Sequence, residues 1–121
     1  MSAFSPTTLA LLELMAQAPR GPRRDGTFAL WLMVRLLEDL AVTAPPVDRT
    51  FRRRVALLEK RLSSLVLSPP LRRGLTGVLA TLKEAARPEP APMLSLLAAP
   101  AREAIGPETG DLLLRASRTL R

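Results

Sequence analysis

The chain has 121 residues and a formal net charge of +7, with 18 Lys or Arg against 11 Asp or Glu. It contains no Cys and no His, which excludes disulfides, zinc–thiolate sites and acid–base chemistry by histidine. A hydrophobic content of 47% is enough for a core, and the length fits one domain spanning residues 1–121.

A first helix is predicted to begin at Ser5-Pro6, where a capping hydroxyl precedes a proline at the first helical position, and to end near Ala18. Residues 19–26 (PRGPRRDG) are rich in helix breakers and charge and therefore predict a loop. The N-terminus lacks the basic region of a signal peptide, so we expect a cytoplasmic protein.

The second helix is expected to run from a cap at Asp25 or Thr27 to about Val42. Residues 28–34 are apolar around the whole circumference, which is typical of a helix at the centre of a bundle or buried against a partner. This run is far shorter than the ~20 residues that cross a bilayer. If a partner or a second copy of the chain covers it, the predicted protein interface comprises Phe28, Trp31 and Leu32.

Residues 48–87 predict an antiparallel αα-hairpin, with helices at about 48–67 and 69–87. Asp48 is the expected cap of the first helix, and Ser68-Pro69-Pro70 reverses the chain. Apolar residues recur at steps of four and three in both arms. The two predicted seams are Phe51, Val55, Leu58, Leu62 and Leu65, and Leu71, Leu75, Val78, Leu82 and Ala85.

The C-terminal third predicts shorter elements. A stiff proline-rich linker is expected at 87–92, followed by a short helix at 93–99 that Pro100 kinks or restarts. A last helix is expected from about Thr109 to Leu120. Sustained alternation of apolar and polar residues is absent, so the predicted fold class is all-α: a small helical bundle built on the hairpin, with two N-terminal helices and short C-terminal ones.

Two glycines, Gly74 and Gly77, fall on one flank of the second hairpin helix together with Thr81. Each glycine costs up to about 1 kcal/mol in a helix interior. The flank therefore predicts a close approach, by another helix of the chain, by a partner subunit or by a phosphate backbone.

The basic residues concentrate in the first loop and the first hairpin arm. At 100° per residue, Arg49, Arg53 and Lys60 lie opposite the apolar seam, and Arg52 shares its flank with Glu59. Such a stripe is typical of binding to the nucleic-acid backbone; an acidic protein partner and a merely solvated face are the alternatives. The predicted backbone contacts are Arg20, Arg23, Arg24, Arg49, Arg52, Arg53, Arg54, Lys60, Arg61, Arg72 and Arg73.

Enzymatic chemistry has no support in the sequence. The serines lack a histidine to activate them, no pair of carboxylates is spaced for metal or acid–base work, and no phosphate-binding loop follows a strand. We therefore expect a non-enzymatic protein without a cofactor, acting on nucleic acid, on protein subunits of an assembly or on a second copy of itself. Binding of the basic hairpin arm to anionic lipid ranks behind these alternatives.

In size, charge and architecture the chain is similar to the small helical subunits of multi-subunit nucleoprotein machines, CRISPR effector small subunits among them. No motif carries this resemblance, so it applies to the class of protein only. It implies a subunit that lines a nucleic acid without reading its bases.

Overall fold

A computed structural model describes residues 4–44 and 46–120 of the chain. This part contains helices and no strand, which confirms the all-α prediction. The helices are α1 (Pro6–Gln17), α2 (Pro22–Thr43), α3 (Arg49–Ser63), α4 (Pro69–Glu84), α5 (Pro90–Ala104) and α6 (Pro107–Thr119).

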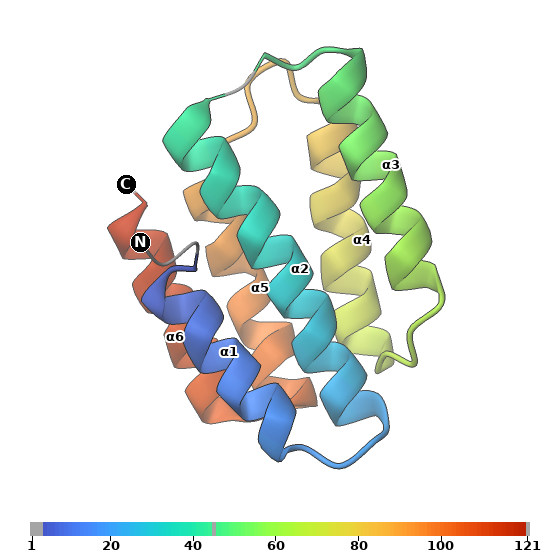
Figure 1. Cartoon of the computed structure of the whole chain (residues 1–121), viewed down its shortest axis with the longest axis vertical. Coiled ribbons are helices and arrows are strands. Elements are labelled where there is room, and N and C mark those ends of the chain that lie inside the picture. Colours follow the sequence, from blue (N-terminus) through green and yellow to red (C-terminus); the bar gives the residue numbers. More distant parts are fainter. Residues whose placement is uncertain (1–3, 45, 121) are drawn as a thin grey trace.

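The helices form two layers of three (Figure 1). α1, α2 and α3 lie side by side in front, and α6, α5 and α4 lie behind them in the reverse order. Each helix therefore packs on its neighbours in the chain, and α2 also packs on α5. The core draws on each of the helices α1 to α6, and its large side chains that are at most 2% exposed include Leu11, Leu30, Met33, Leu37, Val55, Leu71, Leu75, Leu82, Leu94, Leu97 and Leu113.

α2 occupies the centre of the front layer, as its apolar first half predicts. Ala29, Leu30, Met33 and Val34 are completely buried. Phe28, Trp31 and Leu32 are only half-buried and lie on the remaining side of the helix.

The predicted loop at 19–26 is wrong over most of its length, because α2 already begins at Pro22. Proline suits the first helical position, where its missing N–H would have no intrahelical partner. The cap is Gly21, whose φ of 140° favours glycine, rather than Asp25 or Thr27. Asp25 instead accepts a hydrogen bond from the backbone N–H of Val66 at 2.8 Å and ties the α3–α4 turn to the start of α2.

The hairpin forms as predicted, with slightly shorter helices. Asp48 caps α3 by accepting from the N–H of Phe51 at 3.0 Å. The seam positions of α3 from Phe51 to Leu62 are buried or half-buried, and those of α4 from Leu71 to Leu82 are buried. Leu65 is half-buried but lies beyond the end of α3. Ala85 lies just beyond the end of α4. The chain between α2 and α3 includes residue 45, which lies outside the described residues.

The C-terminal third is more regular than predicted. The linker covers residues 85–89 and not the predicted 87–92, because Pro90 begins α5 instead of lying within the linker. Pro100 neither ends nor restarts a helix, since α5 continues through it to Ala104. Its ring lies against Gly74 of α4, where a Cβ would come within 3.0 Å of Pro100 Cγ. The space that glycine leaves open is therefore filled by the proline of the neighbouring helix.

Candidate functional site

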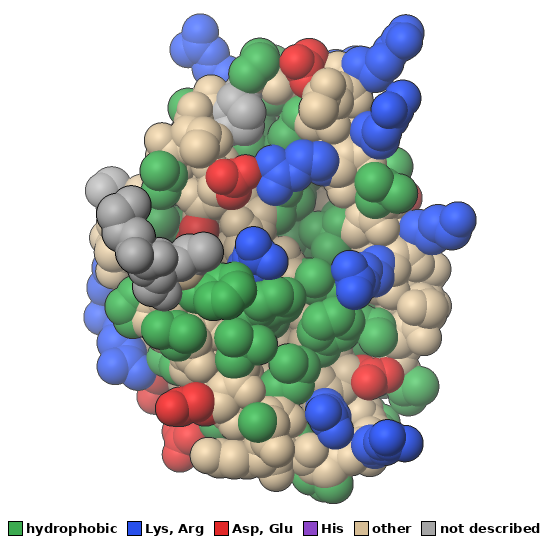
Figure 2. Space-filling view, viewed as in Figure 1, with side chains coloured by type: hydrophobic (Ala, Val, Ile, Leu, Met, Phe, Trp, Pro, Cys, Tyr) green, Lys and Arg blue, Asp and Glu red, His purple; other side chains and the backbone are tan. Residues whose placement is uncertain are grey.

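Three cations line the outer side of α3, and we call them the α3 ridge: Arg49, Arg53 and Lys60. All three are exposed, on the side of the helix opposite Phe51 and Val55, which are almost fully buried. None of the three forms an ion pair or a side-chain hydrogen bond with a described residue. In Figure 2, Lys and Arg side chains project along the edge of the molecule that α3 forms.

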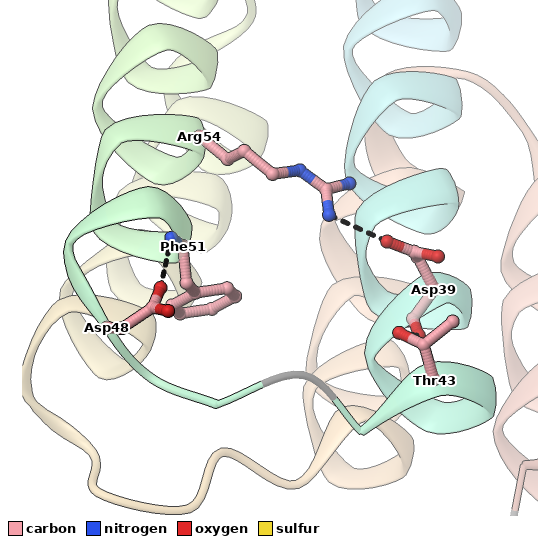
Figure 3. A network of polar contacts seen from close by, with 5 residues as sticks. All are labelled: Asp39, Thr43, Asp48, Phe51 and Arg54. Carbon is pink, nitrogen blue, oxygen red and sulfur yellow. Dashed lines mark hydrogen bonds and ion pairs between the residues drawn. The ribbon is translucent and has the colours of Figure 1, made fainter.

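The two flanks of α3 carry charges that are used within the bundle. Arg54 reaches across to α2 and pairs with Asp39 at 2.7 Å (Figure 3). On the other flank Glu59 pairs with Lys83 of α4. Arg52 is exposed on the same flank as Glu59. Exposed pairs of this kind contribute about 0–1 kcal/mol each.

Most of the remaining predicted cations lie towards the α3–α4 turn, at the Lys60 end of the α3 ridge. Arg72 donates to the carbonyl oxygen of Leu65 at 2.8 Å and closes the α3–α4 turn. Arg23 turns towards the α5–α6 connection, where its Nη2 lies 3.6 Å from the position a Cβ on Gly106 would take. The structure therefore does not place Arg23 with the α3 ridge. Three more predicted cations are exposed near this end: Arg20, Arg24 and Arg73.

An aromatic cluster occupies the front of the molecule beside α3. The ring of Trp31 stacks on Phe28 with centroids 6.2 Å apart and meets Phe4 at 5.8 Å. Two guanidinium groups lie over these rings. Arg35 is 4.9 Å from the Trp31 centroid and 5.0 Å from that of Phe4, and Arg61 is 5.5 Å from that of Phe28. The rings are thus engaged within the chain, and the indole N–H of Trp31 is buried without a hydrogen-bond partner among the described residues.

A groove of about 890 Å³ runs over the exposed side of α2 beside this cluster. Its floor and walls are mainly apolar, and Figure 2 shows the hydrophobic side chains gathered between α2 and α3 with cations around them. The apolar lining comprises Phe4, Leu32, Leu36, Val42, Leu57, Leu58 and Leu120. Of the predicted interface residues, Leu32 lines this groove, whereas Phe28 and Trp31 lie in the aromatic cluster.

One acidic side chain of the groove is perturbed. Burial raises the pKa of the Glu38 carboxyl, and a hydrogen bond from the Ser5 hydroxyl at 2.8 Å lowers it in part. The desolvated carboxylate is the less favoured form there.

The sequence did not point to Arg35 or to the groove. Two signals were present: Arg35 lies four residues after Trp31, on the same side of a helix, and Leu57 is a leucine outside the α3 seam. Neither signal indicates a binding site until the packing of α2 beside α3 is known.

Within the described residues, no three His, Cys, Asp or Glu side chains are grouped to hold a metal ion. No described helix combines the length and the apolarity needed to cross a bilayer. Compared with known protein families, curated proteins and solved structures, the chain matches none of them. The candidate surfaces therefore rest on their own geometry and charge.

Proposed function

We propose that this protein is a non-enzymatic subunit that binds the backbone of nucleic acid through the α3 ridge, without reading base sequence. The observation that carries the proposal is the row Arg49, Arg53 and Lys60, exposed and without an ion pair in the described chain. The row covers about 16 Å along one side of a straight helix.

Folding gains little from the two arginines of this row, whereas Lys60 stands in the last turn of α3, where the helix dipole favours a cation. Arg49 and Arg53 are spaced i, i+4, and like charges at that spacing destabilise a helix by about 0.2–0.5 kcal/mol. Arg49 and Arg52 also stand in the first turn of α3, which contains no acidic residue and where the helix dipole disfavours positive charge. An external polyanion would remove both penalties, and arginine binds phosphate with two parallel hydrogen bonds.

The aromatic residues support binding without base readout. Recognition of unpaired bases uses exposed rings for stacking. Phe51 is 2% exposed, and the rings of Phe4 and Phe28 each contact that of Trp31. Contacts to phosphates position a protein on nucleic acid without reading sequence, which is the role of the small helical subunits that line nucleic acid within larger assemblies.

The test compares two triple variants with equal net charge. Arg49→Gln, Arg53→Gln and Lys60→Gln remove the ridge; Arg87→Gln, Arg115→Gln and Arg118→Gln remove three exposed cations elsewhere. Fluorescence anisotropy measures the affinity for labelled duplex and single strands of two unrelated sequences between about 50 and 200 mM salt.

The ridge variant should flatten the log–log salt slope by about 2.7 on duplex or about 2.1 on single strands, because three phosphate contacts are lost. The control variant should leave the slope close to that of the parent, and both base sequences should bind alike. Equal flattening in the two variants, or a parent that binds no nucleic acid in a salt-dependent way, would refute the proposal.

A further inference from the structure

The groove over α2 has the composition of a site for a small molecule with an apolar body. Its volume of about 890 Å³ falls in the range of about 300–1,000 Å³ for ligand sites. Two of its apolar side chains are unusually open to solvent, since Leu57 is 61% and Val42 is 80% exposed. The bundle gains little from these two residues, whereas an apolar ligand would cover them.

The charge of the groove is unbalanced at one end. Arg35 and Arg61 lie over adjoining rings of the aromatic cluster, and neither forms an ion pair with a described carboxylate. Of the two acidic residues of the groove, Asp39 is paired with Arg54, and Glu38 accepts a hydrogen bond from Ser5 but forms no ion pair with a described residue. The charged side chains that line the groove are three arginines and two carboxylates, which leaves one positive charge in excess. Two guanidinium groups thus border an apolar surface without an anionic partner.

We propose that this groove binds an anionic amphiphile, a single acyl chain ending in a carboxylate. The carboxylate would bind between Arg35 and Arg61, because guanidinium forks match carboxylates. The acyl chain would lie along Leu36, Leu57 and Leu58 towards the Arg54–Asp39 pair. Arg54 and Arg61 are seven residues apart on α3, so this stretch is about 10 Å long.

The geometry favours an acyl chain over a partner helix. The Arg54–Asp39 ion pair joins the two sides of the groove (Figure 3). A helix with its side chains is about 10–12 Å wide, so it enters only after this pair opens, whereas an acyl chain lies beside it. A second copy of the chain is disfavoured by electrostatics, since both the chain and the rim of the groove are positive.

The probe is dodecanoate below its micellar concentration, followed by the fluorescence of Trp31 and by calorimetry. Two controls separate chain from charge: dodecyltrimethylammonium has the same chain with a cationic head, and hexanoate has the same head with half the chain. Dodecanoate should bind one to one, at least about 10-fold more tightly than the cationic amphiphile and about 100-fold more tightly than hexanoate.

Two variants locate the site, with one control. Arg61→Gln and Leu57→Ser should each weaken dodecanoate binding by about 10-fold or more; both side chains are exposed, and circular dichroism checks that the fold is kept. Arg87→Gln, an exposed arginine outside the groove, should bind as the parent does.

The inference is wrong if no saturable binding occurs below the micellar concentration, or if both head groups bind equally. It is also wrong if Arg61→Gln and Arg87→Gln lose the same affinity. Light scattering that reveals a dimer abolished by Leu57→Glu would assign the groove to a second copy and overturn it as well. The result is distinguishable from the nucleic-acid proposal, because none of Arg49, Arg53 and Lys60 lines the groove.

Discussion

Gly74 and Gly77 of α4 allow the packing of α4 on α5 to be tested with one chemical change in two environments. A Cβ on Gly77 would meet no heavy atom within 4 Å, apart from chain neighbours and the backbone of its own helix, so alanine there should gain the full helix preference. That preference is about 0.5–1 kcal/mol. A Cβ on Gly74 would lie 3.0 Å from Pro100 Cγ and 3.5 Å from Leu97 Cδ2.

The proline ring cannot rotate away, so α4 and α5 would have to move apart. Overpacking of this kind costs about 1–3 kcal/mol, which exceeds the gain in helix preference. Gly77→Ala should therefore stabilise the protein by about 0.5–1 kcal/mol, and Gly74→Ala should destabilise it by up to about 2 kcal/mol.

Urea and thermal unfolding followed by circular dichroism measure both changes. At this chain length 1 kcal/mol moves the melting temperature by about 3–5 °C, so the two variants should shift it in opposite directions. In a Pro100→Ala background the contact is relieved, and Gly74→Ala should no longer destabilise. If Gly74→Ala stabilises the parent as much as Gly77→Ala does, the close approach of α5 at this position is refuted.

The other predictions concern the core, the groove and the aromatic cluster. Leu82→Ala should cost about 2–5 kcal/mol in urea unfolding because Leu82 is fully buried; Leu58→Ala should cost clearly less, because Leu58 is half-buried, and equal losses would contradict the burial of the seam. Burial raises the pKa of Glu38, so the folded state holds this proton more tightly than the unfolded state and loses stability as the pH rises through the carboxyl range. Glu38→Gln should therefore be more stable than the parent near neutral pH, and the advantage should vanish below about pH 3.5; an advantage that persists at low pH would show another cause. Trp31 emission should not change on dilution, because its ring contacts come from one chain; a red shift would show that a second copy covers it.

The hairpin and the helix caps could be predicted because they depend on local spacing. Seam residues such as Val55 and Leu75 recur at helical steps, and the caps Ser5 and Asp48 each precede an amide they can accept from. These features need only the geometry of one helix. The central place of α2 followed in the same way from its apolar circumference.

The helix boundaries at the prolines were predicted wrongly because proline breaks a helix or begins one, depending on its surroundings. Pro22 and Pro90 occupy first helical positions, which spacing alone does not distinguish from loop positions. Pro100 is tolerated within α5 because Gly74 of another helix leaves room for its ring. That pairing is a tertiary contact 26 residues apart in the chain, and no pattern around Pro100 encodes it.

The part of the candidate site that depends on a single helix could be predicted from the sequence, and the part that depends on helix packing could not. The wheel of α3 placed Arg49, Arg53 and Lys60 opposite the seam, and they are exposed on that side. It could not show that Arg54 pairs with Asp39 or that Arg61 lies over Phe28, since both partners belong to α2. The groove and its unbalanced charge arise only from the packing of separate helices.

The charged residues of α3 fall into two groups, those that form ion pairs with neighbouring helices and those that form none with a described residue. Residues 49–63 contain six basic residues and one acidic residue, and the ion pairs Arg54–Asp39 and Lys83–Glu59 attach its two flanks to α2 and α4. These pairs and the Asp48 cap offset part of the repulsion among the cations. Replacing the α3 ridge with glutamine or alanine would remove that repulsion without loss of a core contact, because its side chains face solvent. The two arginines of the ridge therefore cost folding energy, whereas Lys60 in the last turn of α3 is favoured by the helix dipole. Binding of an external anion is the role that we propose for the two arginines, because it would offset their cost.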